Sequence, residues 1–305
     1  MQRTTDITRP KTLEELLPST LMARLDPLDL ASRKVFYGKL KGERRSKKRG
    51  QSVEFADHRS YVSGDDIRHI DWNIFARLDT LFLKLFLEEE DLALHVVIDA
   101  SASSDCGNPS KFAFMQRAAM AMGYVGLVNL NRVAATAMGE GAVLSSVRDL
   151  RGKRRVHDLA RWMCSVEPGG SFSFREAAER IALSRRGKGI MLVFSDFFFK
   201  EGFETGLKLL KGRGYDVFCI QVLSPQEVEP DLVGDLRLRD VEDMDMAEIT
   251  VSAPLLKRYK ANLAAYCESL REFCARREMQ LLTIRSDTPI ESFILDSLRK
   301  RGVVK

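Results

Sequence analysis

The feature that most constrains the fold of this 305-residue chain is an apolar run over residues 92–98 that ends in Asp99-x-Ser101-x-Ser103. Neither Gly nor Pro interrupts the run, which is typical of a strand buried on both faces of a parallel sheet. Open α/β sheets bind ligands just beyond the carboxyl ends of such strands. One carboxylate and two hydroxyls at alternate positions are hard oxygen ligands of the kind that Mg²⁺ prefers. The motif therefore predicts a central strand with a candidate cation site at its end.

Helix-like and strand-like segments alternate from residue 92 onward, which predicts an α/β fold with a doubly wound, mainly parallel sheet. Residues 132–138 and 142–147 predict a strand pair at the sheet edge, and residues 235–250 predict an antiparallel insertion. The remaining predicted strands are 189–194, 215–222 and 280–284, and the predicted helices are 110–131, 155–165, 174–184, 201–212, 254–277 and 292–300.

The sequence before residue 91 has a different texture, so we divide the chain into three parts. Residues 1–25 are predicted to form an N-terminal arm with one short helix. Residues 26–90 are predicted to combine an amphipathic helix over 26–41, a basic loop over 41–50 and a small β-rich appendage with strands at 52–55 and 80–87. Residues 91–305 are predicted to form the α/β domain.

Composition narrows the class of protein. Hydrophobic residues make up 45% of the chain, which is ordinary for a globular protein. No apolar stretch approaches the 18 residues of a membrane-spanning helix, and the first residues lack a secretory signal, so we expect a cytoplasmic protein. The five cysteines are scattered without a Cys-x-x-Cys pair, which disfavours a zinc site and predicts free thiols.

The positive charge of the chain is concentrated in one segment. Residues 41–50 hold six basic residues and one acidic residue, while the whole chain has a net charge of +5. Such a run is usually a solvated loop. The alternative is a contact with nucleic acid or an acidic protein through its positive potential.

Two further segments bear on Asp99. The turn Pro168-Gly169-Gly170-Ser171 places a hydroxyl before a predicted helix, and Asp196 follows a predicted buried strand as Asp99 does. Two carboxylates and three hydroxyls form an all-oxygen shell that suits Mg²⁺ or Mn²⁺. The alternative is that Asp99 and Ser101 only bind the amides of their own turn, a common role for Asp and Ser.

This pattern resembles the metal-ion-dependent adhesion site of von Willebrand factor A domains. The resemblance implies as ligands Asp99, Ser101, Ser103, Ser171 and Asp196. The usual Thr of that family's turn is Ser here, and Ser173 competes with Ser171 for the role.

A second, more specific resemblance lies upstream. Residues 54–61, 64–73 and 76–78 are similar to the signature of the bacterial domain-of-unknown-function 58 family. The resemblance implies a von Willebrand A-like domain after the signature and a partnership with MoxR-type AAA+ ATPases. Many members also carry two membrane helices at the amino terminus, which this sequence is predicted to lack.

The charged block within the signature allows two interpretations. In the first, directional Arg–carboxylate pairs form a structural ion-pair network that holds an irregular lobe in place. His58 and His69 would also take part in this network. Alternatively, the block is a recognition surface, because Arg, Trp and Tyr dominate protein interfaces. The candidate partner-binding residues are Arg59, Tyr61, Asp65, Asp66, Arg68, Asp71, Trp72 and Arg77.

The sequence lacks a phosphate-binding Gly-x-x-x-x-Gly-Lys-Ser/Thr loop, a Gly-x-Gly-x-x-Gly fingerprint and a Gly-x-Ser-x-Gly elbow. We therefore predict a non-enzymatic, metal-dependent protein-binding adaptor that works with a MoxR-type AAA+ ATPase in the assembly or maturation of client proteins. The alternatives are a metal-dependent hydrolase at the same residues, or a nucleic-acid contact through residues 41–50.

Overall fold

The computed structural model describes residues 9–31, 54–87, 92–184, 189–231, 234–239 and 246–305. The chain divides into two compact units. The first, which we call the sheet unit, comprises Met1–Arg33 and Leu92–Lys305, and the second, the signature unit, comprises Lys34–Asp91. Each unit is described by itself.

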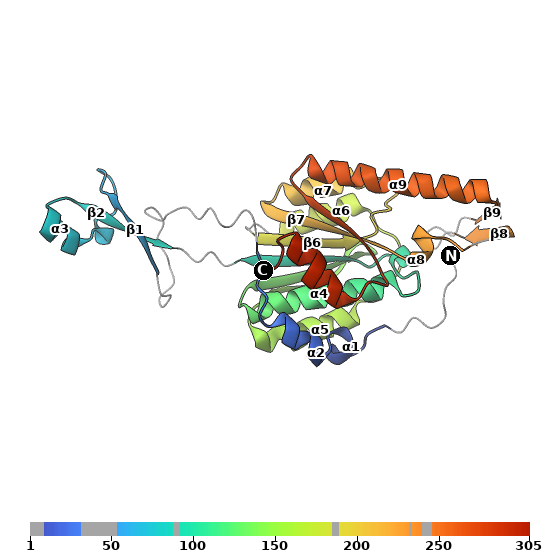
Figure 1. Cartoon of the computed structure of the whole chain (residues 1–305), viewed down its shortest axis with the longest axis horizontal. Helices are drawn as coiled ribbons and strands as arrows, with labels where there is room; N and C mark the ends of the chain where they lie inside the picture. The colour runs from blue at the N-terminus through green and yellow to red at the C-terminus, as the bar shows by residue number, and fades with distance from the viewer. Residues whose placement is uncertain (1–8, 32–53, 88–91, 185–188, 232–233, 240–245) are drawn as a thin grey trace. The chain divides into compact units, whose positions relative to one another are not determined.

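The sheet unit is built on a six-stranded sheet with the strand order β10-β7-β6-β3-β4-β5 (Figure 1). Strand β5 is antiparallel to β4, and every other neighbouring pair is parallel. This confirms the predicted α/β class, the mainly parallel sheet and the strand pair at its edge. The strands are β3 (Ala93–Asp99), β4 (Arg132–Gly139), β5 (Ala142–Leu150), β6 (Gly189–Ser195), β7 (Tyr215–Leu223) and β10 (Gln280–Arg285).

Helices cover both faces of this sheet (Figure 1). Helices α4 (Lys111–Val128) and α5 (Val156–Ser165) contribute to one buried apolar cluster, and α6 (Phe174–Ser184), α7 (Glu204–Lys211) and α9 (Ala253–Ala275) contribute to a second. Strand β3 supplies Leu94, Val96 and Ile98 to the first cluster and Ala93 and Val97 to the second. Because successive side chains of a strand point to opposite faces, the uninterrupted apolar run of β3 fits a central position.

The amino-terminal segment differs from the predicted arm over its described part. Helices α1 (Leu13–Leu16) and α2 (Ser19–Leu25) bury Leu16, Leu17, Leu21 and Leu25 in the cluster that contains α4 and α5. The reason is that leucines at helical spacing form an apolar stripe that needs a partner surface.

The segment after α2 also differs from its prediction. Residues 27–31 are not helical, and Leu30 instead forms a bridge with Val304. The rest of the helix predicted over 26–41, and the basic loop predicted over 41–50, lie outside the described residues.

The carboxyl-terminal half of the sheet unit contains the predicted insertion. Strands β8 (Gly234–Arg239) and β9 (Met246–Val251) pair antiparallel between the short helix α8 (Pro225–Val228) and α9. The predicted closing helix is the short α10 (Ile290–Ser292), which continues as a π-helical turn over Phe293–Leu298. The described part of the unit also contains two 3₁₀ turns, Ala102–Ser104 and Lys153–Arg155.

Over its described residues, 54–87, the signature unit forms a two-stranded antiparallel ribbon with a helix. Strand β1 (Glu54–Ser60) pairs with β2 (Phe82–Leu87), and α3 (Trp72–Leu78) lies between them in sequence after a 3₁₀ turn over Ile67–His69. In the described part of the chain, no helix has the length and apolar character needed to cross a membrane.

Candidate cation site

The candidate site lies where the path of the chain through the sheet reverses. Strands β3 and β6 are parallel neighbours. Helix α4 leads from β3 toward β4, whereas α7 leads from β6 to β7 on the opposite face of the sheet. Connections that leave adjacent strands toward opposite faces open a crevice between their carboxyl ends. Asp99 ends β3 and Asp196 follows β6, so both carboxylates lie at this crevice.

Asp99 is buried and held at both carboxylate oxygens. The Ser195 hydroxyl donates to Oδ2 at 2.6 Å, and the Ser101 amide donates to Oδ1 at 2.9 Å. Burial, and after it the charge of Asp196, raise the pKa of Asp99 to about 6 against the lowering effect of these hydrogen bonds. The turn contact that we predicted as the alternative role of Asp99 is therefore present, and it leaves further lone pairs on both oxygens.

The hydroxyl groups come from two loops that are tied together. The Ala102 amide donates to the Gly170 carbonyl and the Gly169 amide to the Ala100 carbonyl, both at 2.9 Å. Gly170 has a φ of 62°, in the left-handed region that favours glycine. These bonds bring the Gly169-Gly170-Ser171 turn beside Ser101 and Ser103, whose hydroxyls are 3.0 Å apart.

The structure also distinguishes between Ser171 and Ser173, the two candidate ligands from the turn. The Ser173 hydroxyl donates to the carboxylate of Glu201 at 2.9 Å and accepts from the Glu176 amide in the first turn of α6. Ser171 is exposed and lines the candidate site. Because Ser173 is committed to these contacts, Ser171 is the better candidate ligand of the two.

All five residues of the predicted cation site line one pocket, which has a volume of about 380 Å³. Its rim carries aromatic side chains, of which Phe198 is 39% exposed, and the oppositely charged Lys200 and Glu201. The lining residues of the predicted site are Asp99, Ser101, Ser103, Ser171 and Asp196.

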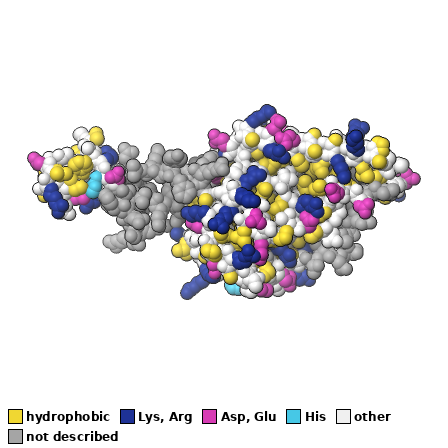
Figure 2. Space-filling model, in the orientation of Figure 1, with side chains coloured by type: hydrophobic (Ala, Val, Ile, Leu, Met, Phe, Trp, Pro, Cys, Tyr) yellow, Lys and Arg dark blue, Asp and Glu magenta, His cyan; other side chains and the backbone are white. Residues whose placement is uncertain are grey.

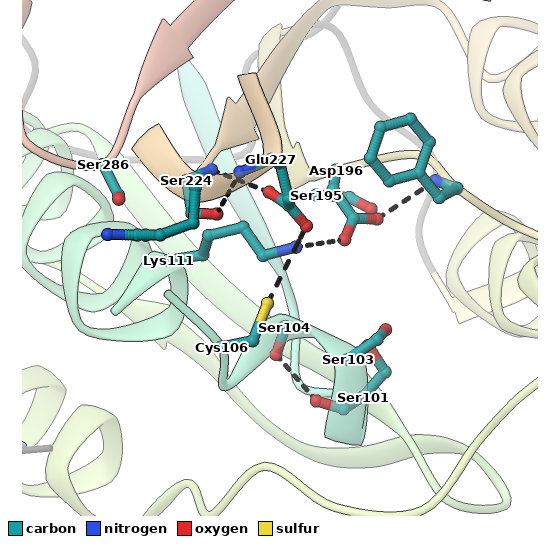
Figure 3. Close-up of polar contacts among 12 residues, drawn as sticks. Ser101, Ser103, Ser104, Cys106, Lys111, Ser195, Asp196, Ser224, Glu227 and Ser286 are labelled. Atoms are coloured by element: carbon teal, nitrogen blue, oxygen red, sulfur yellow. Dashed lines mark hydrogen bonds and ion pairs between the residues drawn. The ribbon is translucent and has the colours of Figure 1, made fainter. Parts of the chain in front are cut away.

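Asp196 also belongs to a buried ion-pair cluster. Its Oδ2 lies 2.6 Å from Nζ of Lys111, the first residue of α4, and the same Nζ lies 2.7 Å from Oε1 of Glu227 in α8 (Figure 3). Burial alone would lower the pKa of Lys111, but the charges of Asp196 and Glu227 outweigh it and raise this pKa. The Cys106 thiol donates to Glu227 at 3.8 Å, and burial raises its pKa to about 12.

The donor set suits a small, hard cation. Two carboxylates and three hydroxyls supply oxygen alone, as Mg²⁺ and Mn²⁺ prefer. Within the described residues, no group of three or more His, Cys, Asp or Glu side chains could hold a metal ion. A cation here would therefore depend on the serine hydroxyls and on water in addition to Asp99 and Asp196.

Three residues in contact with the site, Ser195, Lys111 and Glu227, were not predicted from the sequence. Ser195 directly precedes Asp196, and its position at the end of a buried strand was the available signal. Glu227 forms a capping box with Ser224, a pattern visible as Ser-Pro-x-Glu. The sequence signal for Lys111 is weaker, because it consists only of a basic residue at the first position of a mostly apolar helix.

In the signature unit, most candidate partner-binding residues are engaged in contacts of the unit itself. Arg59 forms two hydrogen bonds with Asp65, at 2.8 and 2.7 Å, and Arg68 pairs with Asp66 at 2.5 Å. Apolar side chains are nevertheless exposed, and Figure 2 shows hydrophobic atoms gathered on the visible face of this unit. The exposed apolar residues are Val62, Ile67, Trp72, which is 59% exposed, and Leu78. Tyr61 is half-buried and Arg77 is exposed.

Asp71 is the polar centre of the signature unit. Its side chain accepts from the Asn73 and Ile74 amides at the start of α3, and its Oδ2 lies 3.0 Å from His58 and 3.4 Å from Lys84. Burial would raise the pKa of Asp71, but these hydrogen bonds together lower it to about 2. Because the folded pKa is below its unfolded value of about 4, the ionised carboxylate stabilises the fold above pH 4. This stabilisation is lost as the pH falls toward 2.

We therefore predict that Asp71→Asn opens the signature unit at a higher pH than the wild type. Pepsin cleavage within residues 54–87, measured at steps from pH 4 to pH 2, should start at pH 4 in the variant and only on further acidification in the wild type. Asp79→Asn is the matched control, because Asp79 is exposed and has a φ of 50°, which Asn tolerates. Equal cleavage of both variants at every pH would contradict the role given to Asp71.

The family of the chain follows from a comparison with known protein families. The model of the family described as "Protein of unknown function DUF58" matches residues 57–269, which include the signature unit from residue 57 onward, β3 and the candidate site. The chain belongs to this family. Uncharacterized proteins of Mycobacterium bovis and Mycobacterium tuberculosis are 26% identical to it over 272 residues, which cover 88% of this chain and 85% of each relative.

Two solved structures are among those similar to this family member. The conserved hypothetical protein BatB from Bacteroides thetaiotaomicron is 14% identical, covers 70% of this chain and 97% of its own, and has a TM-score of 0.42. An aerotolerance-related membrane protein from Bacteroides fragilis is 13% identical, covers 69% of this chain and 98% of its own, and has a TM-score of 0.44.

Proposed function

We propose that this protein is a non-enzymatic adaptor that binds partner proteins through a divalent cation, Mg²⁺ or Mn²⁺. In this proposal the sheet unit is a doubly wound, von Willebrand A-like domain. Its cation is held by Asp99, Ser101, Ser103, Ser171 and Asp196, and a carboxylate of the partner completes the coordination. Mg²⁺ usually keeps several water ligands rather than being enclosed by protein groups alone, and a carboxylate of the partner could replace one of these waters.

One observation supports the proposal above the others. Residues from three loops, more than 90 positions apart in sequence at their extremes, line a single pocket at the crevice between β3 and β6. Three of the five residues, Ser101, Ser103 and Ser171, supply hydroxyl groups, and these serines come from two different loops. Local turn formation accounts for the bond between Asp99 and the Ser101 amide but not for the convergence of Ser171 and Asp196 on the same pocket.

The surroundings of the pocket favour a protein as the partner. Phe172, Phe198 and Phe199 line it, and Phe198 packs on Tyr266 with ring centroids 5.4 Å apart. Aromatic side chains are enriched at protein interfaces. The family resemblance suggests a MoxR-type AAA+ ATPase as this partner, with assembly or maturation of client proteins as the process.

Retention of a MoxR-type ATPase from the same organism on the immobilised chain tests this function. We expect retention in Mg²⁺ and its loss in EDTA or in Asp99→Ala. Asp158→Ala is the matched control, because Asp158 lies in the first turn of α5, away from the pocket, and should leave retention intact.

Two results would contradict the proposal. The first is retention that neither EDTA nor Asp99→Ala changes. The second is Mg²⁺-dependent turnover of phosphoester substrates that is lost in Asp196→Ala, which would favour a hydrolase at the same residues.

A further inference from the structure

Lys111 is a buried cation that touches the proposed cation site without being one of its ligands. Its side chain is 0% exposed, and its ammonium group bridges Asp196 and Glu227 at 2.6 and 2.7 Å (Figure 3). Both carboxylates are themselves more than nine-tenths buried. Burying a charge is costly unless other charges balance it, so the charges of this interior must be considered together.

The net charge of this interior follows from four buried ionisable side chains. Asp99, Asp196 and Glu227 are three buried carboxylates, and Lys111 is the ammonium that faces two of them. With these groups ionised, the interior has an excess of two negative charges. The neutral thiol of Cys106 adds none, and at the rim of the pocket Lys200 and Glu201 carry opposite charges.

A cation with two positive charges would therefore neutralise this interior. A trivalent cation would leave one positive charge in excess. Without Lys111, the three carboxylates would instead be neutralised by a trivalent cation. Electrostatic energies are large at such sites because little water screens them.

We propose that Lys111 is a positioning residue that sets the charge preference of the cation site. It cancels one of the three carboxylate charges and thereby makes a doubly charged cation the best match. Lys111 acts through its contact with Asp196, and Glu227 acts through Lys111. This inference rests on the proposed function, because it assumes that the pocket binds a cation.

The test is the ratio of the dissociation constants for Tb³⁺ and Mg²⁺, each measured by calorimetry at pH 7.5. Lys111→Met should shift the ratio at least tenfold toward Tb³⁺, and Glu227→Gln should shift it at least tenfold away from Tb³⁺. The double variant has the charge of the wild type and should restore the ratio to within threefold. Lys153→Met is the matched control, and a change below threefold is expected because Lys153 is 64% exposed and does not line the pocket.

The outcomes separate this inference from the proposed function. Binding of both cations by the wild type, with a ratio that Glu227→Gln leaves unchanged, would overturn the role of Lys111 alone. Failure of the wild type to bind either cation would overturn the cation site and this inference with it. Glu227→Gln keeps the pair between Lys111 and Asp196, so the ratio can be measured even where Lys111→Met impairs folding.

Discussion

Replacing Lys111 by methionine is expected to destabilise the sheet unit by about 3–5 kcal/mol, the usual cost of removing one partner from a buried ion pair. Methionine keeps most of the aliphatic stem but leaves the carboxylates of Asp196 and Glu227 buried beside each other without a cation. Adding Glu227→Gln should recover part of the loss, because it removes one of the two unbalanced charges.

Urea unfolding followed by far-ultraviolet circular dichroism measures this effect. Lys153→Met is the matched control, since Lys153 is 64% exposed and lies 3.6 Å from Asp26 at the surface. An exposed pair of this kind contributes at most about 1 kcal/mol. A loss of stability in Lys111→Met no greater than in Lys153→Met would show that the buried cluster is not a determinant of the fold.

The second large effect is a gain of stability in Asp99→Asn. The pKa of Asp99 is raised to about 6 in the folded protein, above its unfolded value of about 4, so its ionised form opposes folding at neutral pH. The difference corresponds to about 3 kcal/mol above pH 6, and it disappears as the pH falls below 4. Asparagine removes the charge at the cost of rearranging the hydrogen bond from Ser195, about 1 kcal/mol.

We therefore expect Asp99→Asn to stabilise the cation-free protein by about 2 kcal/mol at pH 7.5, which raises Tm by about 4–8 °C. The gain should shrink at pH 5. In saturating Mg²⁺ the order should reverse, because the wild type gains stability by binding and the variant does not. Ser103→Ala serves as the control, since it removes a candidate ligand without removing a charge. A variant less stable than the wild type in EDTA would contradict the account of Asp99.

Much of the sheet unit could be predicted because local patterns determine it. The apolar run of β3 is buried on both faces, as a central strand requires, and the polar residues after β3 and β6 mark the ends of those strands. The parallel sheet then brings both ends to one edge. The amino-terminal leucines show the limit of this reasoning, because their spacing predicts helices but does not reveal the surface of α4 and α5 that covers them.

The buried cluster could not be predicted for the same reason. Lys111 and Glu227 are 116 residues apart and Lys111 and Asp196 are 85 apart, so their contacts depend on the order of strands in the sheet. In that order β6 lies between β7 and β3, and β4 lies on the other side of β3. No local sequence pattern encodes this arrangement. The choice between Ser171 and Ser173 likewise required the contacts of Ser173 with Glu201 and α6.

The most direct test of a cation at the crevice between β3 and β6 is a crystal structure of the protein grown with MnCl₂, with anomalous diffraction used to locate manganese. We expect an anomalous peak within about 2.5 Å of oxygen atoms of Asp99, Ser101 and Ser103, a distance typical of hard cations bound by oxygen. A well-ordered crystal with no peak in this pocket, or with manganese bound only elsewhere, would contradict it.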